Sequence, residues 1–318
     1  LFRSSAASDV YKRQVVASSL DESNYWSKVG LLDGDPENRG SVPLKEENVA
    51  RLEEYMRAFN QPISTVTLEQ GEYANTGFTQ WGASGLAAAW AEENTRESLF
   101  AAFRRKETFA TTGPRISVRF FGGYNLSSID LNSESLVSEA YSKGVTMGAD
   151  LLNNDDQIPE FIVWALRDMN SAPLQRIQII KGWIDMNSGR PKEKVFDVAC
   201  SDGLEPDPIT NRCPDNGARV NINDCSITSN VGSSELKTVW KDPEFKVDDK
   251  AFYYVRVLEN PTCRWSTWDA IKSGFKPREG LHETIQERAW SSPIWYIPKQ
   301  SEVEVIPLGG TIQLRNID

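Results

Sequence analysis

The chain has 318 residues, of which 39% are hydrophobic and 25% are charged. This composition is typical of a folded globular protein. The 35 Lys and Arg residues against 45 Asp and Glu residues give a net charge of -10, which disfavours nucleic acid as a partner because a phosphate backbone is also negative. No apolar run approaches the ~20 residues of a membrane helix, so the sequence predicts no membrane span.

The first fourteen residues do not read as part of a domain. The segment Leu1 to Gln14 resembles translated sequencing-adapter sequence of the kind found at the ends of metagenomic reading frames. We therefore expect residues 1–14 to be an artefactual leader. The authentic chain is then expected to begin at about Val15, as the C-terminal fragment of a longer protein.

Residues 15–114 have a mixed pattern. The apolar spacing over Lys45 to Phe59 predicts an amphipathic helix, and Gly85 to Trp90 is a short strand candidate. Asn94 to Glu97 has the character of a capping box that opens another helix. A strand followed by a capped helix indicates an α/β unit, and we interpret 15–114 as the C-terminal remnant of an α/β domain.

From Arg115 onward the apolar period changes from 3.6 to 2, which is the period of strands. Long loops are expected at Gly123 to Asp155 and at Ser201 to Asp249. Several short strands without intervening helices predict an antiparallel β-sandwich over 115–318, so the fold class is α+β. The strands expected after the first one, at Ile116 to Phe120, are Phe161–Leu166, Arg176–Lys181, Lys194–Val198, Ala251–Leu258, Pro293–Ile297, Glu302–Ile306 and Thr311–Leu314.

The four cysteines, Cys200, Cys213, Cys225 and Cys263, lie in a loop-rich stretch without the paired CxxC spacing of zinc sites. Their even number and the polar loop between Cys200 and Cys213 favour two structural disulfides over free thiols. The sequence leaves all three possible pairings open. Disulfides indicate export, to the periplasm or beyond.

Few residues carry a signal for chemistry. His282 is the only histidine, and one imidazole cannot build a metal cluster. Because it lies among Glu283 and Glu287 in a polar segment, we interpret it as a surface or structural residue and not a catalytic one. Glu92 and Glu93 lie where a strand passes into a helix, a place where α/β folds bind ligands. The alternative, which we favour, is that they complement the positive end of the helix.

Ten tryptophans are many for this length. Trp164, Trp183 and Trp295 fall within or beside strand patterns, and we expect them in the core. Trp265 and Trp268 lie in a loop-like stretch, and we expect them to be exposed, where aromatic rings can stack on sugars.

Five blocks of the sequence resemble a bacterial family of unknown function, domain of unknown function 3604, of the PHP-like (polymerase-and-histidinol-phosphatase-like) metallohydrolase superfamily. The resemblance covers nearly everything after Val15. The blocks are Ala91–Glu97, Arg105–Arg115, Ile177–Trp183, Ala251–Glu259 and Gln286–Tyr296.

The resemblance implies an exported parent whose N-terminal PHP-like domain holds a divalent metal through His and Asp residues upstream of Val15. Such a parent would hydrolyse phosphoester, amide or carbamate bonds of a small-molecule or glycan substrate. The fragment itself would hold no metal or other cofactor and would be inactive, with Asn24, Glu92 and Arg115 as candidates for the edge of the pocket. The alternative is a non-catalytic sandwich that binds glycan, or another surface ligand, through its loop aromatics.

Overall fold

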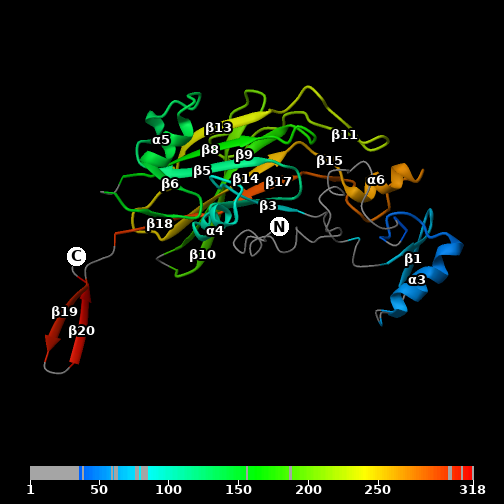
Figure 1. Ribbon diagram of the computed structural model, residues 1–318, viewed down its shortest axis with the longest axis horizontal. Coiled ribbons are helices and arrows are strands. Elements are labelled where there is room, and N and C mark those ends of the chain that lie inside the picture. Colours follow the sequence, from blue (N-terminus) through cyan, green and yellow to red (C-terminus); the bar gives the residue numbers. More distant parts are fainter. Residues whose placement is uncertain are drawn as a thin grey trace.

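The computed structural model describes residues 36, 37, 39–58, 60, 64–75, 79, 85–154, 157–185, 188–299, 303–308 and 311–316. The expected leader, 1–14, and the candidate Asn24 lie outside these ranges. Helices and many antiparallel strands make the described part an α+β structure, as expected (Figure 1).

Two sheets form the main body. The larger has eight strands, in the order β10-β9-β14-β17-β4-β3, with β18 beside β14 and β7 beside β18. Its pairs are antiparallel except for β18 with β7. The strands are β3 (Leu86–Ala89), β4 (Thr108–Thr111), β7 (Asp150–Leu152), β9 (Leu174–Ile184), β10 (Pro191–Cys200), β14 (Ala251–Glu259), β17 (Arg288–Ser291) and β18 (Ile294–Ile297).

The smaller sheet has four strands in the order β13-β8-β5-β6. All of its pairs are antiparallel. The strands are β5 (Ser117–Gly123), β6 (Gly144–Thr146), β8 (Glu160–Leu166) and β13 (Glu235–Lys241).

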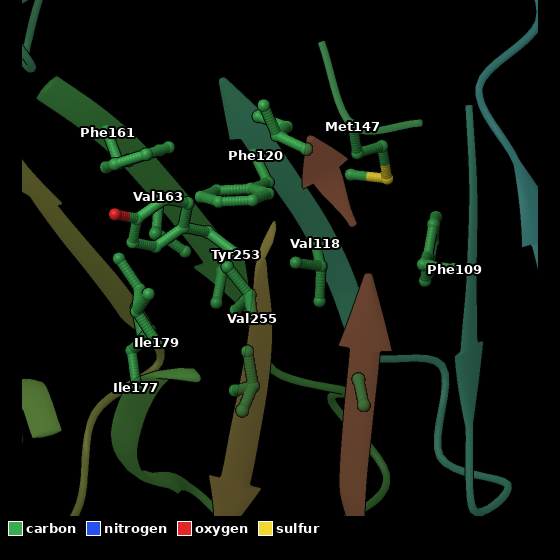
Figure 2. Close-up of a cluster of buried hydrophobic side chains, with 14 of the residues drawn as sticks. Phe109, Val118, Phe120, Met147, Phe161, Val163, Ile177, Ile179, Tyr253 and Val255 are labelled. Atoms are coloured by element: carbon green, nitrogen blue, oxygen red, sulfur yellow. The ribbon is translucent and has the colours of Figure 1, made fainter. Parts of the chain in front are cut away.

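The two sheets share one buried core. Figure 2 shows side chains of β5 and β8, from the smaller sheet, beside those of β9 and β14, from the larger. The ring of Phe161 on β8 has its centroid 4.5 Å from that of Tyr253 on β14 and 5.6 Å from that of Phe120 on β5. Alternate residues of each strand face this core, as the period of two predicts, and this is the arrangement that a sandwich requires.

Every strand expected between Ile116 and Thr311 is present, with ends shifted by a few residues. The expected boundary at residue 115 does not separate the body from what precedes it, however. β3 and β4 lie before this boundary, yet β4 pairs with β17 in the larger sheet. The helix between them, α4 (Arg96–Arg104), is capped at its N-terminus by Thr95, whose hydroxyl accepts from the Ser98 N–H. Because β3 and β4 are antiparallel, the expected α/β unit is instead a helical connection within this sheet.

The two expected long loops contain regular structure, so that expectation was wrong. The stretch 123–155 holds the 3-10 helix η2 (Leu126–Ser128), the helix α5 (Leu136–Lys143), β6 and β7. Leu126, Leu136 and Ala140 pack on Phe121 and Ile162, covering the outer face of the smaller sheet (Figure 1). The stretch 201–249 holds β13 and the short hairpin of β11 (Val220–Asn221) and β12 (Ser226–Ile227). Five of these elements, η2, β6, β7, β11 and β12, are only two or three residues long, too short to show an apolar period.

The remaining elements lie beside the body or at its ends. They are α3 (Glu46–Ala58), β1 (Thr65–Leu68), β2 (Gly71–Ala74), β15 (Thr262–Cys263), α6 (Trp265–Lys272), β16 (Thr284–Ile285), β19 (Val303–Leu308) and β20 (Thr311–Asn316). The helix expected from Lys45 is α3. Among the described residues, none of the helices has the length and apolar character to cross a membrane.

Candidate functional site

A pocket of about 660 Å³ lies at the end of the body where β9 and β17 begin. This is the end that carries β11, β15 and α6 (Figure 1). The pocket is lined by Gln175, Arg176, Asp215, Ala218, Arg219, Pro261, Arg264, His282, Thr284, Ile285, Gln286 and Arg288.

The lining is strongly basic in a chain that is acidic as a whole. Four arginines and one aspartate give it a formal charge of +3 when His282 is neutral, against -10 for the entire chain. The arginines are 112 positions apart at most and come from β9, the loop before β11, the start of α6 and the start of β17. Folding, not local sequence, therefore creates the positive site.

Arg176 lies near the start of β9, and residues of β9 and β10 hold its side chain in place. Its Nε and Nη2 donate to Gln175 Oε1 at 3.0 and 2.6 Å, and its Nη1 lies 3.1 Å from Asp197 Oδ2. These bonds use three of the five N–H donors of a guanidinium. Gln286 Nε2 also donates to Gln175 Oε1, at 2.9 Å, which connects this wall to the segment before β17.

Arg264 is the residue directly before α6. Its side chain is buried, donates to Thr79 O and Ser266 Oγ at 2.8 Å each, and stacks over the ring of Trp265. Burial lowers the pKa of Arg264 to about 10, so it remains a cation at neutral pH. Helix α6 is itself anchored by a bidentate pair between Arg39 and Asp269, with N–O distances of 3.0 to 3.1 Å.

The loop that supplies Asp215, Ala218 and Arg219 is fastened at both ends by disulfides. Cys200, at the end of β10, is bonded to Cys213, and Cys225 is bonded to Cys263, next to Arg264. The expected disulfides are thus confirmed, in one of the three possible pairings. Such bonds persist in oxidising compartments.

Asn216 holds the middle of the same loop against the body. Its Nδ2 donates to Ser201 Oγ at 3.1 Å and to Asn260 Oδ1 at 2.9 Å. Its Oδ1 accepts from Gln175 Nε2 at 3.2 Å and from the Ala218 N–H, also at 3.2 Å. The loop is therefore a fixed wall of the pocket.

Asp215 and Arg219 form an ion pair on this wall. Arg219 Nη2 lies 2.6 Å from Asp215 Oδ2 and Nη1 lies 3.2 Å from Oδ1, while the Gly217 N–H donates to Oδ1 at 2.9 Å. The hydrogen bonds from Arg219 and Gly217, with the charges of Arg219 and Arg176, lower the pKa of Asp215 to about 2. The pocket therefore contains an ionised carboxylate as well as cations.

Glu92 and Arg115, expected at the edge of the parent's pocket, are not among the residues that line the pocket described here. Glu92 is exposed in the connection between β3 and α4. Arg115 is also exposed, and its backbone N–H donates to Asp168 Oδ2 at 2.8 Å. Neither is part of the pocket's lining, and Asn24 lies outside the described residues.

The tryptophan expectations need correction. Trp265 and Trp268 lie on α6 and not in a loop, and Trp265 is 7% exposed, packed under Arg264. Trp268 is half-buried. Trp295, expected in the core, is 42% exposed because its neighbours Ile294 and Tyr296 take the inward positions of β18.

Sequence reasoning missed the four arginines and Asp215. His282, expected at the surface or in a structural role, is exposed on the wall of the pocket. Isolated arginines at strand ends have no periodic signal. The one available hint is that Arg264 directly follows Cys263.

A second charged group is enclosed by the core and serves packing. Lys181 Nζ lies 2.6 Å from Asp242 Oδ2, both side chains being 2% exposed or less. Tyr253 donates its hydroxyl to the same oxygen at 2.8 Å, and burial raises the pKa of Tyr253. These residues are not part of the pocket's lining. They join β9 and β14 to the end of β13.

The described ranges contain no group of three or more His, Cys, Asp or Glu side chains arranged to hold a metal ion. The expected divalent metal therefore cannot be assigned to these residues, and we derive no catalytic step through it.

Comparison with known proteins places the chain in a family. The model of the family described as "Protein of unknown function (DUF3604)" matches residues 5–298. The chain belongs to this family. The match begins within the expected leader and includes every residue of the pocket. No curated protein and no solved structure matches the chain.

Proposed function

We propose that this DUF3604 chain binds an anionic ligand in the arginine-lined pocket. The observation that carries the proposal is the gathering of Arg176, Arg219, Arg264 and Arg288 around one cavity of about 660 Å³. This volume lies in the range of about 300–1,000 Å³ that small-molecule sites occupy. Guanidinium groups present a planar fork of N–H donors that matches carboxylate, sulfate and phosphate oxygens.

The alternative is that these arginines only hold the fold together. Arg176 does so in part, because it pairs with the buried Asp197. The residues that line the pocket nevertheless carry three more positive than negative formal charges. Such a concentration in an acidic chain attracts small anions and disfavours other ligands.

The metal-dependent hydrolysis expected from the PHP-like resemblance is proposed for the parent protein only. In that protein, the pocket would hold the anionic part of a substrate whose phosphoester, amide or carbamate bond is cleaved elsewhere. The two disulfides support a location in the periplasm or outside the cell. The chain described here would then supply recognition, and we expect it to have no hydrolase activity by itself.

The test is calorimetric titration of the purified chain with sodium sulfate at constant chloride concentration. We expect saturable binding, and we expect Arg219→Gln and Arg288→Gln each to weaken it at least fivefold. Arg219 is mostly exposed, with a side chain 67% accessible, so its replacement leaves the fold intact. Arg104→Gln, an exposed arginine in the last turn of α4, is the matched control and should bind as the natural chain does.

Binding that does not saturate, or that survives unchanged in the Arg219→Gln/Arg288→Gln double variant, would show that the pocket is not an anion site. Saturation is essential to the design, because sulfate also stabilises proteins non-specifically by exclusion from their surface.

A further inference from the structure

Asp215 is the unusual residue of the pocket, because a carboxylate opposes the binding of a simple anion. Its orientation is fixed, because Arg219 and the Gly217 N–H donate hydrogen bonds to both of its carboxylate oxygens. A carboxylate has about four acceptor positions, and these bonds occupy three. The remaining position is on Oδ2, and the side chain is 61% accessible to solvent.

An ionised carboxylate with an unoccupied acceptor position can accept a hydrogen bond from a hydroxyl group. A ligand that offers hydroxyl donors to Asp215 and an anionic group to the arginines would satisfy both kinds of charge in the pocket. A bare inorganic anion can satisfy only the arginines, and it is repelled by Asp215. The lining thus favours a ligand that carries both an anionic group and hydroxyl groups.

An ordinary explanation for Asp215 also exists. Exposed ion pairs between residues i and i+4, such as Asp215 and Arg219, are common and contribute about 0.2–1 kcal/mol. Two features separate this pair from that class. It lies on the lining of a pocket with three further arginines, and its loop is fixed by two disulfides and by Asn216.

The rest of the lining fits a hydroxylated ring. Ala218, Pro261 and Ile285 provide apolar surface for C–H groups, and Gln286 and Thr284 provide polar groups beside it. The volume of about 660 Å³ corresponds to some twenty water molecules at ~30 Å³ each, far more than one inorganic anion displaces. A ligand that fills the site must therefore extend well beyond its charged group.

We propose that the pocket selects an acidic sugar, a ligand with one anionic group and several hydroxyl groups. The four arginines of the pocket bind the anionic group, and Asp215 accepts from a hydroxyl group of the ring. The inference rests on the proposed anion binding and specifies its ligand. The anionic group can be the carboxylate of a uronic acid or the sulfate of a sulfated sugar, because both present oxygens to guanidinium groups.

The test compares two ligands with the same ring size and the same carboxylate. D-glucuronate carries hydroxyl groups, and cyclohexanecarboxylate does not. In calorimetric titrations, we expect the natural chain to bind glucuronate at least tenfold more tightly. Asp215→Ala should lose this preference, by weakening glucuronate binding at least tenfold while cyclohexanecarboxylate binds equally well or more tightly.

Asp248→Ala is the matched control, since it removes the same charge from an exposed loop at the other end of β14. It should preserve the tenfold preference. Galactose 6-sulfate, titrated beside glucuronate, decides between the two sources: tighter binding of either one identifies the anionic group that the arginines prefer.

Equal affinities for glucuronate and cyclohexanecarboxylate in the natural chain would overturn the acidic-sugar proposal and leave anion binding standing. Equal weakening of both ligands by Asp215→Ala would also overturn it, since Asp215 would then only position Arg219. The proposed function itself fails if neither carboxylate binds and Arg288→Gln leaves the affinity for sulfate unchanged.

Discussion

The Arg176 guanidinium lies 3.1 Å from the carboxylate of Asp197, whose side chain is completely buried. Asp197 accepts from three further groups. They are Gln178 Nε2 at 2.6 Å, the Cys213 N–H at 2.8 Å and Arg212 Nη1 at 3.3 Å. One carboxylate therefore joins β9, β10 and the loop that forms a wall of the pocket. Asp197 therefore both orients the Arg176 side chain and neutralises part of its positive charge.

Asp197→Asn should destabilise the chain. Removing one partner of a buried ion pair costs about 3–5 kcal/mol in general, and we expect about 3 kcal/mol because both arginines are partly exposed. Urea unfolding of the variant measures this loss. Asp248→Asn, in an exposed loop, should unfold as the natural chain does, and a loss below about 0.5 kcal/mol for Asp197→Asn would show that its four donors find other acceptors.

The strands could be predicted from the sequence because their alternation is enforced by the shared core. β8 and β14 each have inward residues at every second position, such as Phe161 and Val163 or Tyr253 and Val255. The pairing of the strands carries no such local signal. Nothing in the sequence shows that β4 lies beside β17, more than 170 residues away in the chain.

The pocket could not be predicted for the same reason. Its arginines become neighbours only through the order of strands in the larger sheet and the pairing of the cysteines. Trp265 is a case in which the local sequence gives the wrong structure, since the residues around it predict a loop. The helix α6 instead buries it under Arg264.

The disulfides should contribute unequally to stability. The bond Cys225–Cys263 closes a separation of 38 residues and Cys200–Cys213 one of 13. Chain entropy predicts losses of about 4 and about 3 kcal/mol when each pair is replaced by alanine. Both replacements should also weaken sulfate binding, because each bond fastens one end of the loop that carries Arg219.

Denaturant unfolding and sulfate titration of the two double variants, with the dithiothreitol-reduced natural chain for comparison, check this order. A larger loss for the Cys200→Ala/Cys213→Ala variant would mean that native contacts, and not loop length, set the contribution of each bond. Unchanged sulfate affinity in both variants would show that Asn216 and its hydrogen bonds suffice to hold the wall.

Gly182 and Phe252 should be energetically coupled. They are paired across β9 and β14, and a Cβ atom on Gly182 would lie 2.2 Å from Phe252 Cζ. Gly182→Ala therefore forces the ring to move, at a cost of about 1 kcal/mol, the low end for overpacking because the ring is half-buried. In a Phe252→Ala background the same change should be neutral or slightly stabilising, since glycine is unfavourable inside a strand.

A double-mutant cycle measured by urea unfolding tests this coupling. The change Gly182→Ala should cost about 1 kcal/mol more in the natural background than in Phe252→Ala. Equal costs in the two backgrounds would mean that the ring turns away freely and that the close approach is not required by the fold.

Asp215 should give the chain a distinct response to acid. Its pKa is lowered from 3.8 to about 2, chiefly by the hydrogen bond from Arg219. A carboxyl group with a lowered pKa in the folded state stabilises that state fully above its ordinary pKa. This contribution is lost as the pH falls through about 2, so stability should decline between about pH 4 and pH 2.

Asp215→Asn removes this titration, and its stability should therefore fall less steeply over the same acid interval. Carbon NMR of the Asp215 carboxyl group locates the pKa directly, and urea unfolding at several pH values compares the two chains. Between pH 8 and pH 4 the carboxylate stays ionised, so it should contribute equally to glucuronate binding throughout. Titration of Asp215 near its ordinary pKa would contradict its fixed geometry with Arg219, because the hydrogen bond from Arg219 is the main cause of the lowered pKa. The acidic-sugar site depends on Asp215 being held in that position.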